Sequence, residues 1–243
     1  MAETRISSAT EPVVVFDLDD TLFDEVDFIL SGIKAVKVLF ETIEGLDVEE
    51  CCLAMREAVR RHKNHYSALE HCLDRAGVRE QVDMSRIVTA LRSHCPVGLE
   101  LRPGVRQILD RLYRRGVTLG ILTDGRSVTQ RHKIAALGIE HYFDSAAIRI
   151  SGETGIDKSN SEAYRWFSEH YPGRKYVYVG DNPAKDFVWP NRMGWLTICI
   201  SDYGRNIHSQ QGIWPGELCA LMTVYDFWEV EESIYKNDTN TEE

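Results

Sequence analysis

The sequence predicts an α/β fold in which a parallel sheet carries helices on both faces, together with a second, α-helical domain. Three observations support this prediction. Strand-like and helix-like segments alternate through residues 96–235, as is typical of parallel sheets. A short apolar run, Val13–Phe16, has the composition of a buried strand. Residues 25–95, which lie between these two parts, show helical periodicity and almost no strand signal.

The helical insert leaves the chain directly after the first strand. We therefore expect it to lie over the carboxyl end of that strand as a cap domain. Gly45 and Gly77 interrupt its periodicity and separate its helices. The core is expected to be discontinuous and to comprise residues 13–24 and 96–235. The cap is expected at residues 25–95, and flexible polar termini at residues 1–12 and 236–243.

Turn residues separate the elements of the alternating region. Helices are expected at 105–115, 127–137, 161–170 and 186–193. Strands are expected at 117–122, 146–150, 176–179 and 196–200, and a last strand–helix unit at 221–235. Right-handed crossovers would join these parallel strands, so the core is expected to be Rossmann-like.

The composition argues against two kinds of partner. A net charge of -10 disfavours binding to a nucleic acid polymer or an anionic membrane, because both require a cationic face. No apolar run approaches the ~18 residues of a membrane span. The six cysteines form no CxxC pair, which argues against a zinc cluster. We expect reduced thiols and a cytoplasmic protein.

Polar side chains follow three strands of the predicted sheet. Asp17 and Asp19 come directly after the first strand, Thr123 follows the second, and Asp181 follows the strand at 176–179. Because the carboxyl ends of parallel strands share one edge of the sheet, these side chains are expected to converge. Crowded carboxylates repel one another unless a cation compensates them. Mg²⁺ fits such a set of oxygen ligands best.

Other polar residues near these strand ends also have ordinary structural explanations. Asp124 and Asp186 follow strands too, where an aspartate is often a helix cap or a turn residue. Asp20 is expected to be a helix or turn residue that faces away from the site. Lys158 ends a glycine-rich polar stretch, 151–158, which is expected to be a loop at the same edge of the sheet.

These residues resemble the motifs of the haloacid dehalogenase superfamily, and they occur in that family's order. Residues 16–22 (FDLDDTL) resemble its first motif and residues 122–125 (LTDG) its second. Lys158 stands where the third motif has a lysine, although Lys185 is an alternative for that role. Residues 180–186 (GDNPAKD) are similar to the fourth motif. The helical insert resembles the cap of the family's phosphatase-like subgroup.

The resemblance implies phosphoryl transfer through an aspartyl-phosphate intermediate. Asp17 would be the nucleophile, and Asp19 would protonate the leaving group and later deprotonate water. Neighbouring carboxylates are expected to favour the protonated form of Asp19. Mg²⁺ would be held by Asp17, by the backbone carbonyl group of Asp19 and by Asp181.

The remaining roles follow from the same resemblance. Thr123 and the backbone N–H group of Asp124 would hold phosphoryl oxygens, and Lys158 would neutralise the charge that develops on them. Asp186 would position Lys158 or a water molecule on the metal. Arg126, directly after the second motif, is a possible contact for an anionic group of the substrate.

The implied activity is a phosphoric monoester hydrolase that acts on a small phosphorylated metabolite, such as a sugar phosphate or a nucleotide. The basic segment 56–65 in the cap would either receive a second anionic group of the substrate or form a solvated helix face. A phosphomutase, a metal-independent dehalogenase and a non-catalytic binding module remain alternatives. A phosphonate hydrolase would need a cap lysine, for which Lys34, Lys37 and Lys63 are available. The sequence leaves the oligomeric state open.

Overall fold

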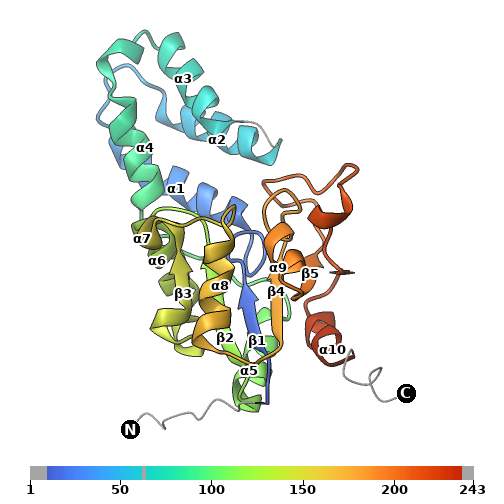
Figure 1. Cartoon of the computed structure of the whole chain (residues 1–243). Helices are drawn as coiled ribbons and strands as arrows, with labels where there is room; N and C mark the ends of the chain where they lie inside the picture. The colour runs from blue at the N-terminus through green and yellow to red at the C-terminus, as the bar shows by residue number, and fades with distance from the viewer. Residues whose placement is uncertain (1–9, 62–63, 237–243) are drawn as a thin grey trace, which may run out of the picture.

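The core of the protein is a six-stranded sheet, and every strand pair in it is parallel (Figure 1). The computed structural model describes residues 10–61 and 64–236. The strand order is β3–β2–β1–β4–β5–β6. The strands are β1 (Val13–Phe16), β2 (Thr118–Thr123), β3 (Ile148–Ile150), β4 (Tyr176–Gly180), β5 (Leu196–Ile200) and β6 (Met222–Val224). The predicted α/β fold with a parallel sheet is confirmed.

The first strand lies in the middle of this sheet. Phe16, its last residue, stands opposite Ile121 of β2 on one side and opposite Val179 of β4 on the other. Since all three strands run in the same direction, the residues that follow them emerge side by side at one edge. The topology therefore brings residues from three distant parts of the sequence together.

Helices cover both faces of the sheet, as the alternation along the sequence predicted. Residues of α5 (Val105–Arg115), α6 (Ser127–Leu137) and α10 (Trp228–Lys236) share one apolar cluster with the sheet. Residues of α8 (Ser161–His170), with Phe187 just before α9 (Val188–Arg192), belong to the cluster on the other face.

The side chains of β1 alternate between these two clusters. Val14 and Phe16 lie in the cluster with α5, whereas Val13 and Val15 lie in the cluster with α8. All four residues are fully buried. A strand buried on both faces needs an apolar residue at every position, which explains the continuous apolar run in the sequence.

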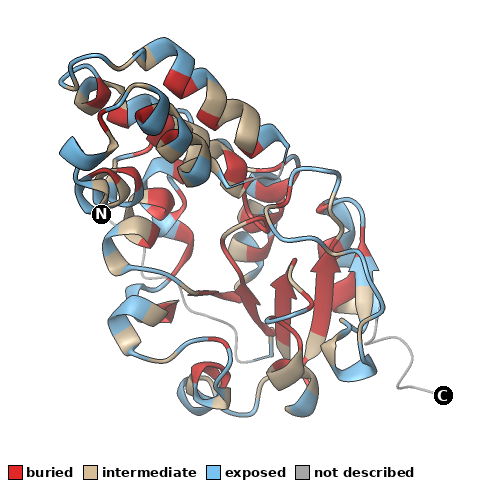
Figure 2. Ribbon diagram, turned by 90° about the horizontal axis from the view of Figure 1, so that it is seen from above, coloured by how far each residue is buried: buried red, intermediate tan, exposed pale blue. Residues whose placement is uncertain are grey.

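The segment after β1 forms a separate layer of helices above the sheet (Figures 1 and 2). It comprises α1 (Glu25–Phe40), α2 (Val48–Arg60), α3 (His65–Arg75) and α4 (Met84–Ser93). Their apolar faces form an apolar cluster distinct from those of the sheet, with Ile33, Phe40, Met55 and Leu69 all fully buried. Because the four helices bury one another's apolar faces, this segment has a hydrophobic core of its own, next to that of the sheet.

Some boundaries differ from the predicted ones. Residues 151–158 were predicted to be a loop, but Ser151–Thr154 form a helical turn, α7. Gly155 ends this turn, because its φ of 72° lets its N–H group donate back to the carbonyl oxygen of Ser151. The helix predicted from residue 186 begins only at Val188, since the carboxylate of Asp186 accepts backbone N–H groups from the preceding turn.

The chain between β5 and β6 contains little regular structure. Residues 201–221, between β5 and β6, form a long irregular segment with one short 3-10 turn at Gly216–Leu218.

Most of the predicted flexible termini lies outside the described residues, although Glu11 accepts hydrogen bonds from Arg115 and Tyr235. Among the helices that the structure describes, none combines the length and apolar character needed to cross a bilayer.

Candidate active site

The carboxyl ends of β1, β2 and β4 bring the predicted site residues together. Asp17 follows β1, Thr123 ends β2, and Asp181 follows β4. The N–H group of Asp17 donates to the carbonyl oxygen of Val179 at 2.8 Å, which extends the pairing of β1 with β4 by one residue. The position of Asp17 is thus set by the sheet itself, and the predicted convergence is observed.

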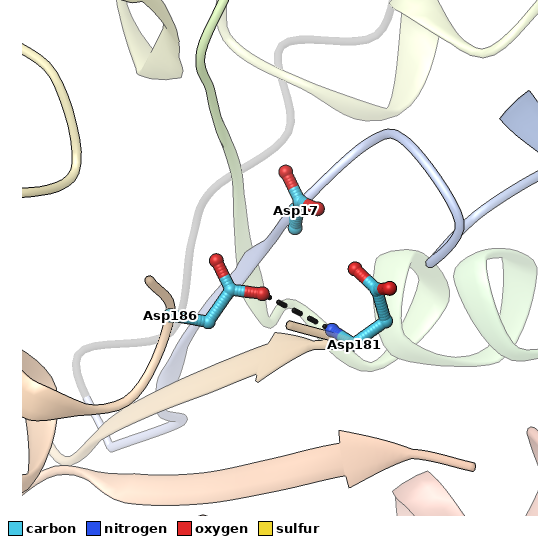
Figure 3. A group of neighbouring side chains, drawn as sticks. All are labelled: Asp17, Asp181 and Asp186. Carbon is cyan, nitrogen blue, oxygen red and sulfur yellow. Dashed lines mark hydrogen bonds between the residues drawn. The ribbon is translucent and has the colours of Figure 1, made fainter. Parts of the chain in front are cut away.

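Three buried aspartates form the centre of the site (Figure 3). Asp17, Asp181 and Asp186 are 5%, 3% and 0% exposed, and each offers a carboxylate oxygen within 4.8 Å of the others. In Figure 3 the carboxyl groups of Asp17 and Asp181 face the same space, while Asp186 reaches back to the backbone of Asp181. This set of hard oxygen donors has the chemistry of a divalent cation site.

The electrostatics of this centre reflect burial and crowding. Burial raises the pKa of Asp17 to about 7; the charge of Lys158 opposes this shift, and those of Asp186 and Asp19 add to it. Burial, and then the charges of Asp186 and Asp17, hold the pKa of Asp181 well above its usual range. A bound divalent cation would favour the ionised carboxylates, so the residues fit such an ion.

Lys158 lies between two of these aspartates. Its Nζ atom is 2.5 Å from Oδ1 of Asp17 and 2.8 Å from Oδ1 of Asp186. Burial favours the neutral amine, but the two carboxylates outweigh it and hold the pKa of Lys158 well above its usual range. Lys185, the alternative lysine, is exposed, although it too lines the site cavity. The geometry thus places the buried cation at Lys158.

Asp186 is held by donors on both of its oxygens. Oδ1 accepts from Lys158, and Oδ2 accepts from the N–H groups of Asp181 and Asn182 at 3.1 and 2.9 Å. Gly180 makes room for this arrangement, since a Cβ atom there would lie 2.5 Å from the carboxylate of Asp186. Asp186 therefore fixes both the loop after β4 and the lysine.

The loop after β2 contributes Thr123 and Asp124. Thr123 is 1% exposed, and its hydroxyl oxygen accepts a hydrogen bond from Nε2 of Gln130 at 2.6 Å. The Asp124 carboxylate accepts the backbone N–H group of Lys158 at 3.1 Å. The side chain of Asp124 therefore joins two loops of the site.

Asp19 is surrounded differently from what the sequence predicted. Oδ1 accepts from Nζ of Lys133 at 2.7 Å, and Oδ2 accepts from Nε2 of Gln130 at 2.7 Å. Besides the neighbouring carboxylates that were expected from the sequence, Asp19 therefore has a buried ammonium group in direct contact. Neither α6 residue belongs to a motif that was recognised in the sequence.

Lys133 also connects this contact to the start of α1. Its Nζ atom lies 3.6 Å from Oε1 of Glu25. Burial raises the pKa of Glu25 to about 8, and the charge of Asp19 adds to this shift while Lys133 opposes it. Burial also favours the neutral form of Lys133, but the charges of Asp19 and Glu25 raise its pKa above the usual value. Lys133 is thus a second buried cation of the site.

The irregular segment after β5 supplies further contacts that the sequence did not indicate. Nδ2 of Asn206 donates to Oδ2 of Asp181 at 2.8 Å, and Oδ1 of Asn206 accepts from Arg102 at 2.6 Å. The backbone N–H group of Ile207 donates to Oδ2 of Asp20 at 2.7 Å. Asp20 is a turn residue, one of the two predicted alternatives, with a φ of 55°, and it lines the site cavity. Asn206 therefore orients one of the three central carboxylates.

Two cavities meet at Asp19. The smaller, of about 120 Å³, contains the central site. The larger, of about 360 Å³, lies between α6 and the helical segment and shares Asp19, Glu25 and Asp124 with the smaller cavity. Its remaining lining residues are Phe28, Ile29, His65, Tyr66, Leu91, Arg92, Gly125, Arg126, Thr129, Gln130 and Lys133. The arrangement offers a polar reaction site beside a roomier, partly apolar chamber.

The predicted substrate contacts, Arg126 and the basic segment 56–65, differ in where they lie. Arg126 is exposed and lines the larger cavity, as does His65 at the end of the basic segment 56–65. Arg61 of that segment instead pairs with Glu57, 2.9 Å away, on the exposed surface. His62 and Lys63 lie outside the described residues. Only part of the basic segment therefore reaches the cavity.

Of the lysines considered for a phosphonate hydrolase, Lys34 and Lys37 lie in the part of the chain that the structure describes. Lys34 is exposed on α1, and Lys37 forms an ion pair with Glu49. Lys63 lies outside the described residues. Among the described candidates, none lines the larger cavity.

Comparison with known proteins assigns this site to a family. Residues 12–187 match the model of the haloacid dehalogenase-like hydrolase family. The chain is 28% identical over 193 residues to a glyceraldehyde 3-phosphate phosphatase of Methanocaldococcus jannaschii, a match that covers 77% of this chain and 83% of that protein. Over a shorter stretch of 88 residues it is 35% identical to a phosphoserine phosphatase of Thermus thermophilus, covering 35% of this chain and 34% of that protein.

Solved structures give the same fold. A 2-haloacid dehalogenase from Pseudomonas syringae superposes with a TM-score of 0.60 at 20% identity, covering 93% of this chain and 99% of that one. A phosphatase from Thermococcus onnurineus superposes with a TM-score of 0.57 at 18% identity, covering 91% and 96% respectively.

The chain belongs to the haloacid dehalogenase-like hydrolase family. The sequence prediction of the family, and of a hydrolase, is confirmed. The fold by itself does not separate phosphatases from dehalogenases, because structures of both kinds superpose on it. The choice between these activities therefore depends on the residues of the site.

Proposed function

We propose that the protein is a Mg²⁺-dependent phosphatase that hydrolyses phosphoric monoesters of small metabolites through a phosphorylated Asp17. The observation that carries this proposal is the buried group of Asp17, Asp181 and Asp186, with Lys158 in contact with two of them. Attack on a phosphate dianion needs positive charge to offset its repulsion from the carboxylate nucleophile. This centre offers both a lysine and a set of cation ligands.

Asp17 and Asp181 are the candidates for direct ligands of the ion. Figure 3 draws their carboxyl groups facing one space, whereas both oxygens of Asp186 already accept from protein donors. Mg²⁺ takes one or two carboxylates and oxygens of a phosphate, and when bound it supplies charge neutralisation between nucleophile and substrate. Asp186 would act by positioning Lys158.

The reaction would proceed in two transfers. A carboxylate oxygen of Asp17 forms a bond to phosphorus while the ester bond to the leaving oxygen breaks, and Asp19 gives a proton to that oxygen. Water then attacks phosphorus, Asp19 takes the proton from the water, and the bond between Asp17 and phosphorus breaks. Thr123 and Lys158 would hold phosphoryl oxygens during both transfers.

The substrate class is supported by the two cavities. The smaller cavity has the polar lining that a phosphoryl group requires, and the larger one, of about 360 Å³, has space for a small organic group. Arg126 and Arg92 at its rim are candidates for contact with a further anionic or polar group. Relatives named as phosphatases of glyceraldehyde 3-phosphate and phosphoserine make triose phosphates and phosphorylated amino acids the first compounds to test.

Phosphate release from p-nitrophenyl phosphate and from a panel of phosphorylated metabolites tests the proposal. We expect turnover with Mg²⁺ and its loss when a chelator removes the ion. Release of halide from a 2-haloacid with no phosphate release would favour a dehalogenase, and an isomerised sugar phosphate as product would favour a phosphomutase. No turnover of any phosphate ester with Mg²⁺ would contradict the proposal.

A further inference from the structure

We propose that Lys133 and Gln130 are positioning residues that hold the Asp19 carboxyl group in the orientation needed for proton transfer to the leaving group. This inference depends on the proposed function, in which Asp19 is the proton donor. It adds two residues of α6 to the site.

The geometry of the contact fixes the carboxyl group from both sides. Nζ of Lys133 donates to Oδ1 of Asp19 at 2.7 Å, and Nε2 of Gln130 donates to Oδ2 at 2.7 Å. The two donors are three positions apart on α6 and therefore lie on the same face of the helix. Because each oxygen has its own donor, rotation of the carboxyl group about its terminal bond would break both contacts.

The two donors are buried, and desolvation of the charged one has an energetic cost. Lys133 is 2% exposed and Gln130 is 1% exposed. Ile134 and Leu137 on the same helix belong to the apolar cluster, so the buried face of α6 combines two apolar and two polar side chains. A buried ammonium group is tolerated only where partners compensate its desolvation. Asp19, together with Glu25 at 3.6 Å, is that compensation.

Phe28 shields the contact from the apolar side. Nζ of Lys133 lies 4.4 Å from the centroid of the Phe28 ring, in a cation–π arrangement. Phe28 also lines the larger cavity, where the organic part of a substrate would lie. Lys133 lines the same cavity, and its ammonium group is held between the Phe28 ring and the Asp19 carboxylate.

The hydrogen bonds from Lys133 and Gln130 leave positions on the Asp19 carboxyl group at which a proton can be carried. A carboxyl group offers about four acceptor positions, and the two donors occupy one position on each oxygen. A proton on a remaining position passes to the leaving oxygen as its bond to phosphorus breaks and the bond from Asp17 forms. Orientation matters in such a step, because a misplacement of about 1 Å costs roughly a hundredfold in rate.

Gln130 further ties the proton donor to the phosphate-binding loop. Nε2 of Gln130 also donates to Oγ1 of Thr123 at 2.6 Å, which leaves the hydroxyl hydrogen of Thr123 available for a phosphoryl oxygen. A single amide group thus sets the spacing between Thr123 and Asp19. The spacing between the phosphoryl group and the proton donor follows from it.

The test compares two aryl phosphates whose leaving groups differ in their need for a proton. Lys133→Met keeps the length and apolar stem of the side chain and removes its charge. We expect kcat/KM to fall about 10- to 100-fold for phenyl phosphate, whose leaving group needs the proton. For 2,4-dinitrophenyl phosphate, whose leaving anion is already stable, we expect a fall of less than about threefold. Because kcat/KM reports only the steps through the first phosphoryl transfer, later hydrolysis does not enter the comparison.

Controls separate positioning from a general loss of structure. Lys34→Met makes the same change on the exposed face of α1 and should leave both values of kcat/KM unchanged. Lys133→Arg should recover part of the loss with phenyl phosphate, because it restores a cation. If thermal denaturation shows that Lys133→Met is not folded, Gln130→Met replaces it in the test. We then expect a smaller fall in kcat/KM, again larger for phenyl phosphate than for 2,4-dinitrophenyl phosphate.

Two results would overturn this inference. One is an equal fall of kcat/KM for both substrates, which would assign Lys133 a purely structural role. The other is no fall for either substrate. In both cases the wild-type protein still releases phosphate, so the proposed function stands. A wild-type protein that hydrolyses neither ester would instead remove the proposed function, and this inference with it.

Discussion

The central site and the rim of the larger cavity hold their charged residues in different ways. In the central site Asp17, Lys158 and Asp186 are at most 5% exposed, and each contacts another member of the group within 2.8 Å. At the rim of the cavity, Arg92 and Arg126 are exposed. The first group is fixed in place by burial and mutual contact, whereas the second lies where solvent screens its charge.

Chemistry and substrate selectivity are therefore expected to reside in different parts of the site. Preorganised groups in a dry site act strongly on charge that develops during a reaction. Exposed arginines contribute less per contact and tolerate replacement, which suits residues that select among related substrates. The central site is built on strand ends of the sheet, while α1, α3, α4 and α6 line the cavity. Substitutions in the two regions should therefore differ in size and kind.

The largest expected effect lies at Asp17. Asp17→Asn removes the nucleophile while preserving the size of the side chain, so kcat should fall by at least about a thousandfold. Phosphate release from p-nitrophenyl phosphate measures this fall, and thermal denaturation checks that the variant remains folded. A folded variant that keeps its rate would contradict the role of Asp17.

The next effect is expected on metal affinity. Asp181→Ala removes one of the two candidate direct ligands, so the affinity for Mg²⁺ should fall at least about tenfold, as measured by titration calorimetry. Asp74→Ala, at an exposed position on α3, is the matched control and should leave the affinity unchanged. If the wild-type protein and Asp181→Ala bound Mg²⁺ with equal affinity, the ion would have to bind elsewhere.

The pH dependence of stability separates the two regions further. Folding raises the pKa of Asp17 to about 7, mainly through burial, so without metal its contribution favours the folded state at acidic pH and is lost as pH rises through 7. Mg²⁺ needs the ionised carboxylates. The rise in Tm on adding Mg²⁺ should therefore grow between pH 5 and pH 8.

Differential scanning calorimetry with Mg²⁺ and with a chelator measures that difference across the pH range. In Asp17→Asn the increase with pH should be smaller, because the titrating carboxyl group is gone. A rise in Tm that stays constant from pH 5 to pH 8 in the wild-type protein would contradict the placement of the ion at these aspartates.

The smallest effect is expected at the rim. Arg126→Ala should raise KM for an anionic substrate about three- to tenfold and leave kcat nearly unchanged, because the contact is made in both the ground state and the transition state. Arg114→Ala, on the exposed face of α5, is the control and should change neither constant. A fall in kcat with KM unchanged would place Arg126 among the reacting groups instead.

The strand ends were predictable because the physical signal is local. A run of apolar residues ending in carboxylates marks both a buried strand and its ligand-binding end, which located Asp17, Asp19 and Asp181 at one edge. The parallel sheet followed from the alternation of elements. The strand order, by contrast, depends on packing between distant segments, which no local pattern encodes.

The contacts of Asp19 and Asp181 were missed for different reasons. Gln130 and Lys133 lie on the buried face of α6 with Ile134 and Leu137. The available signal was therefore the presence of two polar residues at positions where the helical spacing calls for apolar ones. Asn206 lies in the irregular segment between β5 and β6, where no periodicity exists to orient a side chain. Its contact with Asp181 follows only from the three-dimensional fold.

Trapping of the phosphorylated residue is the most direct test of Asp17 as the nucleophile. An Asp19→Asn variant should form the phosphorylated enzyme from 2,4-dinitrophenyl phosphate, whose leaving group needs no proton, but hydrolyse it slowly because the base is missing. Reduction with borohydride after a rapid quench converts an aspartyl-phosphate to homoserine, which peptide mass spectrometry locates. We expect homoserine at position 17. Homoserine at another aspartate, or an unmodified Asp17 while phosphate is released, would contradict it.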